Sequence, residues 1–230
     1  MKKRWMAVLG FTILATLAVA EETAVLNTQK DKVSYGMGVQ AAKKFRSQGI
    51  EVDPDMLARG LKDGLSGAKL LMPEEDLGKI VNVYQAGLKQ ERAAQRKLDS
   101  EENRKKGEAF LAENGTKEGV VTLPSGLQYR VLKEGAGKVP SDDDTVRVHY
   151  RGTHIDGTEF DSSHKSGKPA TFKVKGGIIP GWKEALIRMP VGSKWNLFLP
   201  PVLGYGERGL GSVIGPNETL VFEVELLSVK

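Results

Sequence analysis

Apolar residues recur every four positions in two stretches near the start of the chain, a spacing that places side chains on one face of a helix. The first stretch runs from Asp31 to Gly49, and the second begins at Asp53 and Pro54, an N-cap residue followed by a first-turn proline. The apolar positions of the two predicted helices are Val33, Met37, Ala41 and Phe45, and then Leu57, Leu61 and Leu65. Together the helices span fewer than ~40 residues, too few to bury a core of their own. We therefore expect them to pack against something else.

A third and much longer helix is predicted from residue 74 to residue 113. It follows Pro73, opens with three acidic residues that a helix N-terminus favours, and ends at Asn114 and Gly115. At 1.5 Å per residue it would be roughly 60 Å long. Its apolar stripe comprises Leu77, Ile80, Val81, Tyr84 and Leu88. The stripe fades after about two heptads, too few for a coiled coil, and the polar stretch that follows is typical of a helix that crosses solvent between domains.

From residue 120 onward, short β-branched runs are separated by Gly, Pro and Asp, which is typical of strands and turns. The predicted strands are 120–123, 127–133, 145–153, 171–174, 194–199 and 219–229, with one short helix over 182–189. The predicted fold class is α+β, with an antiparallel sheet wrapped on a short helix. The chain is therefore divided into an all-α module (21–72), a long connecting helix (73–114) and a sheet domain (115–230).

Residues 1–20 have the composition of a secretory signal peptide. Residues 2–4 are basic, residues 5–19 are apolar, and residues 18–20 read Ala-Val-Ala, an A-x-A cleavage site. The apolar run of about fifteen residues is shorter than the ~20 that a membrane-spanning helix needs. We therefore expect an exported protein, periplasmic or associated with the outer-membrane surface, with an uncleaved anchor as the alternative.

Charge and residue usage narrow the possible chemistry. Without the three basic residues of the signal segment, the formal net charge falls from +5 to +2, so no basic excess predicts nucleic-acid binding. The absence of cysteine excludes disulfides, thiolate metal sites, a cysteine nucleophile and a lipidated cysteine after the signal. The three histidines lack metal-ligand spacing, and residues 204–209 match G-x-G-x-x-G without the strand-turn-helix context of a dinucleotide site. We expect no cofactor, no metal and no stable membrane insertion after cleavage.

A set of aromatic and aliphatic residues from residue 146 onward carries the candidate site. It occupies the segments 146–152, 156–163, 177–182, 203–206 and 219–226. In order, spacing and residue identity these segments resemble the FKBP-type peptidyl-prolyl cis-trans isomerases, which rotate the peptide bond before proline. That rotation has a barrier of ~18–20 kcal/mol but breaks no bond. A dry pocket favours the less polar twisted amide, and a hydrogen bond orients it.

The resemblance implies a role for each matching residue. Trp182 would form the floor under the prolyl ring, and Tyr205 would donate its hydroxyl to a substrate carbonyl. Asp161 would point its carboxylate at the rim; an alternative is that it caps a turn with the two following serines. The walls would be Tyr150, Phe160, Ile178, Ile179 and Phe222, and the rim would include Phe172, Val213 and Ile214. Ile179 also matches the position whose backbone amide faces the ligand. Ala170 and Leu210 depart from the family pattern, which leaves substrate preference and drug affinity open.

The whole layout resembles the macrophage infectivity potentiator (Mip) and FkpA-like subgroup of exported bacterial isomerases. The matching N-terminal segments are 33–38 and 57–64. The resemblance implies a homodimer through the N-terminal helices, with Met37 and Met56 as adaptable packing residues and the C-terminal domains held apart. An alternative is an intramolecular clasp, in which the short helices fold onto residues 77–88 of the same chain.

The partners implied by the resemblance are proline-containing unfolded or exported polypeptides, whose folding the isomerase would assist. A rival function is a holdase-type chaperone that binds clients without any required catalysis. A third possibility, a surface adhesion or virulence factor, is supported by no residue of the chain.

Overall fold

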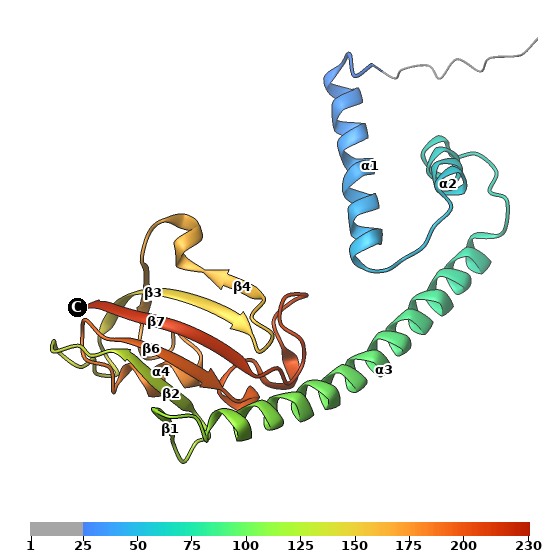
Figure 1. Ribbon diagram of the computed structural model, residues 1–230. Helices are drawn as coiled ribbons and strands as arrows, with labels where there is room; N and C mark the ends of the chain where they lie inside the picture. Colours follow the sequence, from blue (N-terminus) through green and yellow to red (C-terminus); the bar gives the residue numbers. More distant parts are fainter. Residues whose placement is uncertain (1–24) are drawn as a thin grey trace, which may run out of the picture. The chain divides into compact units, whose positions relative to one another are not determined.

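The computed structural model describes residues 25–230, so the predicted signal peptide lies outside the described residues. The chain forms two compact units: a helical unit that ends at Glu74 and a sheet unit from Glu75 to Lys230. The helices are α1 (Gln29–Ser47), α2 (Pro54–Ser66), α3 (Glu74–Asn114) and α4 (Pro180–Leu186) (Figure 1). The strands are β1 (Val120–Thr122), β2 (Gln128–Lys133), β3 (Thr145–His154), β4 (Glu159–Ser162), β5 (Ala170–Lys173), β6 (Lys194–Leu199) and β7 (Leu220–Val229). Within residues 25–230, no helix has both the length and the apolar composition of a membrane span.

The helical unit has well-capped helices and no hydrophobic core within one chain. The side chain of Asp53 accepts hydrogen bonds from the amides of Asp55 (2.8 Å) and Met56 (3.0 Å), which confirms the predicted start of α2. A capping box between Thr28 and Asp31, which was not predicted, starts α1. Asp63 is the only buried residue between residues 25 and 74. The apolar faces of both helices are therefore left for another surface to cover.

The sheet unit is built on one antiparallel sheet, which confirms the predicted α+β class. The strand order is β1-β2-β6-β7-β3-β4, and β5 also pairs with β3. One apolar side of the sheet packs on α4, whose Trp182, Ala185 and Leu186 are buried among residues of β3, β6 and β7. The core is therefore closed between the sheet and a single short helix.

Several elements differ from the sequence-based prediction. Strand β4 was missed because its four residues include two carboxylates and a serine, and its pairing with β3 shifts register between Gly152 and Thr153. Helix α4 begins at Pro180 rather than at Trp182, since proline suits the first helical turn. It ends at Leu186 rather than at Met189, because the amides of Arg188 and Met189 donate to carbonyls three residues earlier, which tightens the chain after the helix. Three short 3₁₀ helices were not predicted: η1 (Ser163–Ser166), η2 (Pro201–Leu203) and η3 (Gly206–Arg208).

Within the sheet unit, the C-terminal half of α3 packs on the sheet and its loops, which corrects the interpretation of this stretch as a helix surrounded by solvent. The ring of Phe110 lies 6.0 Å from that of Phe198. The side-chain amide of Gln128 accepts a hydrogen bond from Asn114 (2.9 Å) and donates one to the carbonyl of Leu111 (2.8 Å). The physical reason for the difference is that polar and small side chains make most of this contact, so no apolar stripe marks it in the sequence.

At Gly107, α3 closely approaches Thr219, the residue before β7. A Cβ atom at this position would lie 2.2 Å from Oγ1 and 3.0 Å from Cβ of Thr219. We expect Gly107→Ala to lower the free energy of unfolding by about 1–3 kcal/mol through overpacking. This loss should outweigh the gain of up to about 1 kcal/mol that alanine usually brings to a helix.

The matched control is Gly78→Ala on the same helix, where nothing lies within 4 Å of the added Cβ. Its free energy of unfolding should stay level or rise. Urea titrations followed by circular dichroism measure both variants. An equal gain in stability for both would contradict the close packing of α3 on Thr219.

Candidate active site

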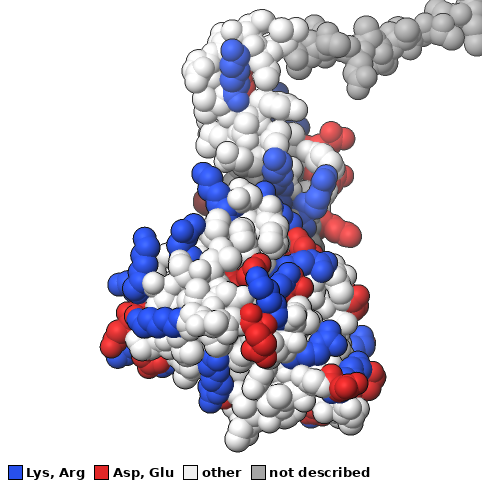
Figure 2. Space-filling view, turned by 60° about the vertical axis from the view of Figure 1, so that its left-hand side comes forward, with Lys and Arg blue, Asp and Glu red and all other residues white. Residues whose placement is uncertain are grey.

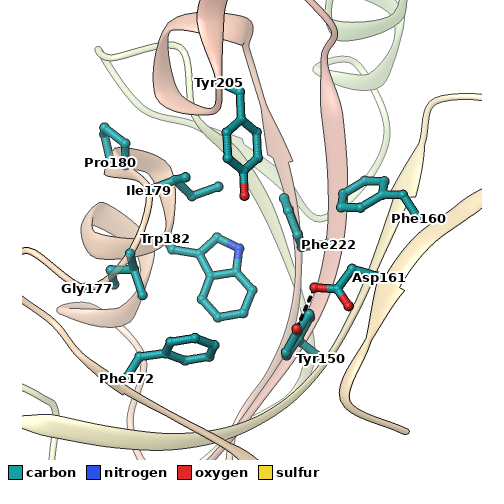
Figure 3. A pocket seen from close by; sticks show the side chains of 11 residues that line it. Tyr150, Phe160, Asp161, Phe172, Gly177, Ile179, Pro180, Trp182, Tyr205 and Phe222 are labelled. Carbon is teal, nitrogen blue, oxygen red and sulfur yellow. Dashed lines mark hydrogen bonds between the residues drawn. The ribbon is translucent and has the colours of Figure 1, made fainter. Parts of the chain in front are cut away.

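An open pocket of about 510 Å³ lies between α4, the strands β3, β4, β5 and β7, and the segment after β6. It is lined by Tyr150, Phe160, Asp161, Phe172, Gly177, Ile178, Ile179, Pro180, Trp182, Tyr205 and Phe222 (Figure 3). All but two of the residues predicted for the site are therefore brought together. Asp161 is the one acidic residue in this lining, which holds no basic residue, and the hydroxyls of Tyr150 and Tyr205 are its other polar side-chain groups.

Trp182 forms the centre of an aromatic cup (Figure 3). The indole is 4% exposed, and three rings meet it edge-on: Tyr150 at 5.2 Å, Phe172 at 5.7 Å and Phe222 at 5.4 Å between ring centroids. Edge-to-face contacts of this kind stabilise each ring in a defined orientation. The indole Nε1 is buried and has no hydrogen-bond partner among the described residues. The floor of the pocket is thus a buried indole held among three rings.

Gly152 on β3 makes room for two of the walls. A Cβ atom there would lie 2.7 Å from the ring of Phe160 and 2.8 Å from the ring of Phe222. These two rings meet edge-on at 5.6 Å. The glycine stands within the motif that first indicated the site, but its spacing alone does not reveal this steric role. Gly177 and Pro180, which also line the pocket, were not predicted either.

Asp161 and Tyr150 form a fixed polar pair at the rim. The Tyr150 hydroxyl donates to Oδ2 of Asp161 at 2.6 Å, while Oδ1 accepts from the backbone amide of Ser162 at 2.8 Å. The carboxylate therefore contacts the turn, as the alternative reading expected, and also faces the pocket. Burial, reinforced by the hydrogen bond to Asp161, raises the pKa of the Tyr150 hydroxyl well above its usual value, so it remains a donor at neutral pH.

Tyr205 and Ile179 present hydrogen-bond donors at the opposite side of the pocket. The hydroxyl of Tyr205 points into the pocket (Figure 3) and makes no hydrogen bond to another described residue. Burial and the nearby charge of Asp161 raise the pKa of this hydroxyl, so it keeps its proton. Ile179 caps α4, and its carbonyl accepts from the amide of Trp182 at 3.1 Å. Within residues 25–230 its own amide has no backbone acceptor.

Two predicted rim residues lie elsewhere. Ile214 is 1% exposed in the core and bridges with Leu210, and Val213 lines a separate hollow beside His154 and Asn103. Spacing in the sequence cannot tell a side chain that faces the pocket from one that faces the core or a neighbouring surface. Phe172, the third predicted rim residue, does line the pocket from β5.

Charges of both signs are mixed on one face of the molecule, and the described residues offer no metal-binding cluster. In Figure 2, the Lys and Arg side chains on the face shown are interspersed with those of Asp and Glu. Residues 25–230 contain no group of three or more His, Asp or Glu side chains that could hold a metal ion. The groups of the site that can act on a bound peptide are its aromatic floor, its two phenols, one carboxylate and the amide of Ile179.

Comparisons with known proteins agree with this arrangement. The family model of the FKBP-type peptidyl-prolyl cis-trans isomerases matches residues 137–227, and the model of the domain amino terminal to these isomerases matches residues 30–131. The "Outer membrane protein MIP" of Legionella longbeachae is 49% identical over 224 residues, which cover 97% of this chain and 95% of the relative. The "Peptidyl-prolyl cis-trans isomerase Mip" of Coxiella burnetii is 44% identical over 211 residues, 92% of this chain and 91% of the relative.

A solved structure extends the likeness to the fold. The crystal structure of FkpA from Escherichia coli matches with a TM-score of 0.65 and 35% identity, covering 90% of this chain and 99% of that one. Sequence and structure thus agree over both the helical unit and the sheet unit. The chain belongs to the FKBP-type peptidyl-prolyl cis-trans isomerases, in the subgroup of Mip and FkpA, and is an enzyme of that type.

Proposed function

We propose that the pocket over Trp182 is the catalytic site and that it rotates Xaa-Pro bonds without a covalent step. The observation that carries the proposal is the convergence of three rings, edge-on, around one buried indole. The twisted amide has lost its resonance and is less polar than either planar isomer. A pocket that excludes water therefore binds the transition state better than the ground state, which is the requirement for catalysis.

Orientation of the substrate is assigned to donors at the rim. The hydroxyl of Tyr205 and the amide of Ile179 lack partners among the described residues and would bind substrate carbonyls. The hydrogen bond from Tyr150 would hold the carboxylate of Asp161 in one orientation at the rim. Holding the peptide on both sides of the bond leaves rotation as the remaining free motion, which lowers the entropic part of the barrier.

Tyr205→Phe tests this assignment, because it removes one hydroxyl and little else. We expect kcat/KM for a short Xaa-Pro peptide to fall about tenfold, the equivalent of one hydrogen bond of about 1.4 kcal/mol. The measurement is a protease-coupled cis-trans assay. Tyr129→Phe is the matched control. The ring of Tyr129 stacks on that of Trp195, with 4.4 Å between the ring centroids, and it does not line the pocket. Full activity of Tyr205→Phe would remove this residue from the mechanism.

The substrates we propose are unfolded polypeptides in an exported compartment, the periplasm or the outer-membrane surface. Support comes from the signal-like composition of residues 1–20 and from a relative that is named an outer membrane protein. Fractionation of cells that express the full chain, with detection of the shortened mature form, tests this part. Retention of the full-length chain in the cytoplasm would contradict it.

We further propose that the helical unit forms a homodimer. Its apolar side chains are exposed in a single chain: Leu65 is 87%, Met37 67% and Leu61 56% exposed. Exposed apolar side chains of this number on a unit without a core are characteristic of an interface, and a second copy would complete the core symmetrically.

A holdase-type chaperone is the second candidate, because the same exposed apolar side chains could bind an unfolded client. One variant can separate the isomerase activity from the holdase activity. A protein with an impaired pocket but an intact helical unit should still suppress aggregation of an unfolded client if the holdase function is real. Loss of suppression together with isomerase activity would argue against it.

A further inference from the structure

Tyr205 stands near the start of a long irregular segment, residues 204–219, which we call the tyrosine loop. The loop is held together by backbone hydrogen bonds. The amide of Gly209 donates to the carbonyl of Tyr205 at 3.1 Å, and the amide of Asn217 donates to the carbonyl of Gly206 at 2.9 Å. The second bond joins the two ends of the loop next to Tyr205. The position of the Tyr205 ring therefore depends on the position of the whole loop.

Three polar side chains of α3 hold the tyrosine loop from outside. Arg96, Ser100 and Asn103 are four and three residues apart, so they share one face of the helix. The guanidinium of Arg96 donates to the carbonyls of Glu207 (2.9 Å) and Arg208 (2.5 Å). The side-chain amide of Asn217 donates to the hydroxyl of Ser100 at 2.8 Å, and that of Asn103 donates to the carbonyl of Pro216 at 3.0 Å.

These contacts lie at two places in the loop: the carbonyl end of η3 and Asn217. Glu207 and Arg208 belong to η3, and the last carbonyls of a short helix lack partners within the helix. Asn217 has φ of 53° and is the only non-glycine residue with a positive φ in the described chain. Such a conformation persists when surrounding contacts fix it. Arg96 supplies partners at one end of the loop, and Ser100 helps to fix Asn217 at the other.

We propose that Arg96, Ser100 and Asn103 are positioning residues for the isomerase reaction, through which α3 sets the place of the Tyr205 hydroxyl. They act through the loop and not on the substrate, because none of them lines the pocket. The inference rests on the proposed role of Tyr205. In this proposal α3 contributes to the geometry of the active site as well as connecting the two units.

The test uses the full chain and the variant Arg96→Ala. We expect kcat/KM for an Xaa-Pro peptide to fall about threefold, within the range of couplings carried by such contacts. Lys97→Ala is the matched control, since Lys97 is exposed on the next position of the helix and makes no hydrogen bond or ion pair with the described residues. Its kcat/KM should match that of the unmodified chain.

A double-mutant cycle with Tyr205→Phe distinguishes positioning from a general structural effect. If α3 acts through Tyr205, Arg96→Ala should change kcat/KM by less than about 1.5-fold once the hydroxyl is gone. Hydrogen exchange supplies a direct readout, because the amides of Gly209 and Asn217 should exchange faster in Arg96→Ala. Ser100→Ala, expected to act in the same direction, replaces Arg96→Ala in the cycle if that variant fails to fold.

Four results decide the matter. A normal loss in Tyr205→Phe with unchanged activity and exchange in Arg96→Ala overturns the inference alone. The same threefold loss in both backgrounds also overturns it, because Arg96 would then act independently of Tyr205. Full activity of Tyr205→Phe overturns the proposed role of Tyr205 together with the inference. Non-additive losses with faster loop exchange support it.

Discussion

Trp182→Ala is expected to lower kcat/KM for an Xaa-Pro peptide about a hundredfold, the equivalent of about 2.7 kcal/mol of transition-state stabilisation. The indole is the floor that three rings surround, so its removal opens the cup to water. Water hydrates the planar amide better than the twisted one and thus cancels the preference on which rotation depends. Activity is measured by the protease-coupled assay and expressed per folded molecule.

Trp195→Ala is the matched control for this substitution. Trp195 is 5% exposed, its Nε1 also lacks a partner among the described residues, and it packs on Tyr129 outside the pocket. Both substitutions should lower the free energy of unfolding by about 3–5 kcal/mol. Only Trp182→Ala should lower the activity of the folded protein. Equal activity losses in the two variants would mean that the effect of Trp182 is structural.

Replacement of Leu61 and Leu65 by lysine is expected to convert a dimer into a monomer. The two leucines are one turn apart on α2 and are 56% and 87% exposed in the single chain. Burial in a dimer would contribute about 1.5–3 kcal/mol for each side chain, whereas burial of an unpaired lysine is strongly unfavourable. Light scattering coupled to gel filtration should give twice the mass of one chain for the unmodified protein and a single mass for the variant.

Lys62→Ala on the same helix is the control and should remain dimeric, because Lys62 is exposed and polar. A monomeric mass for the unmodified chain would contradict the dimer and favour the intramolecular clasp of the short helices on residues 77–88. A dimer that survives both leucine substitutions would place the interface elsewhere.

The helices and most strands were predictable because their signals are local. Asp53 and Pro54 start α2, and alternation of apolar residues marks β3 and β7. The floor and walls of the pocket were predictable from the family resemblance, which carries information about long-range packing that periodicity lacks. Strand β4 was missed because four residues with two carboxylates give no strand signal.

The contacts of α3 were not predictable, for a physical reason that particular residues illustrate. Arg96 and Asn103 donate to backbone carbonyls, and the same residue types would suit a helix surrounded by water. Glycine usually destabilises the interior of a helix, yet Gly107 is where α3 closely approaches Thr219. Ile214 likewise shares the spacing of a rim residue but turns into the core. Hydrophobic patterns describe burial, not the identity of a polar partner.

The central claim is that a water-excluding aromatic cup over Trp182 receives the prolyl ring. Intermolecular nuclear Overhauser effects, recorded while the enzyme turns over a labelled Xaa-Pro peptide, test it most directly. We predict cross-peaks from the prolyl ring protons to the indole of Trp182 and the ring of Phe222, and none to the indole of Trp195. Turnover without any contact between the prolyl ring and Trp182 would contradict the account.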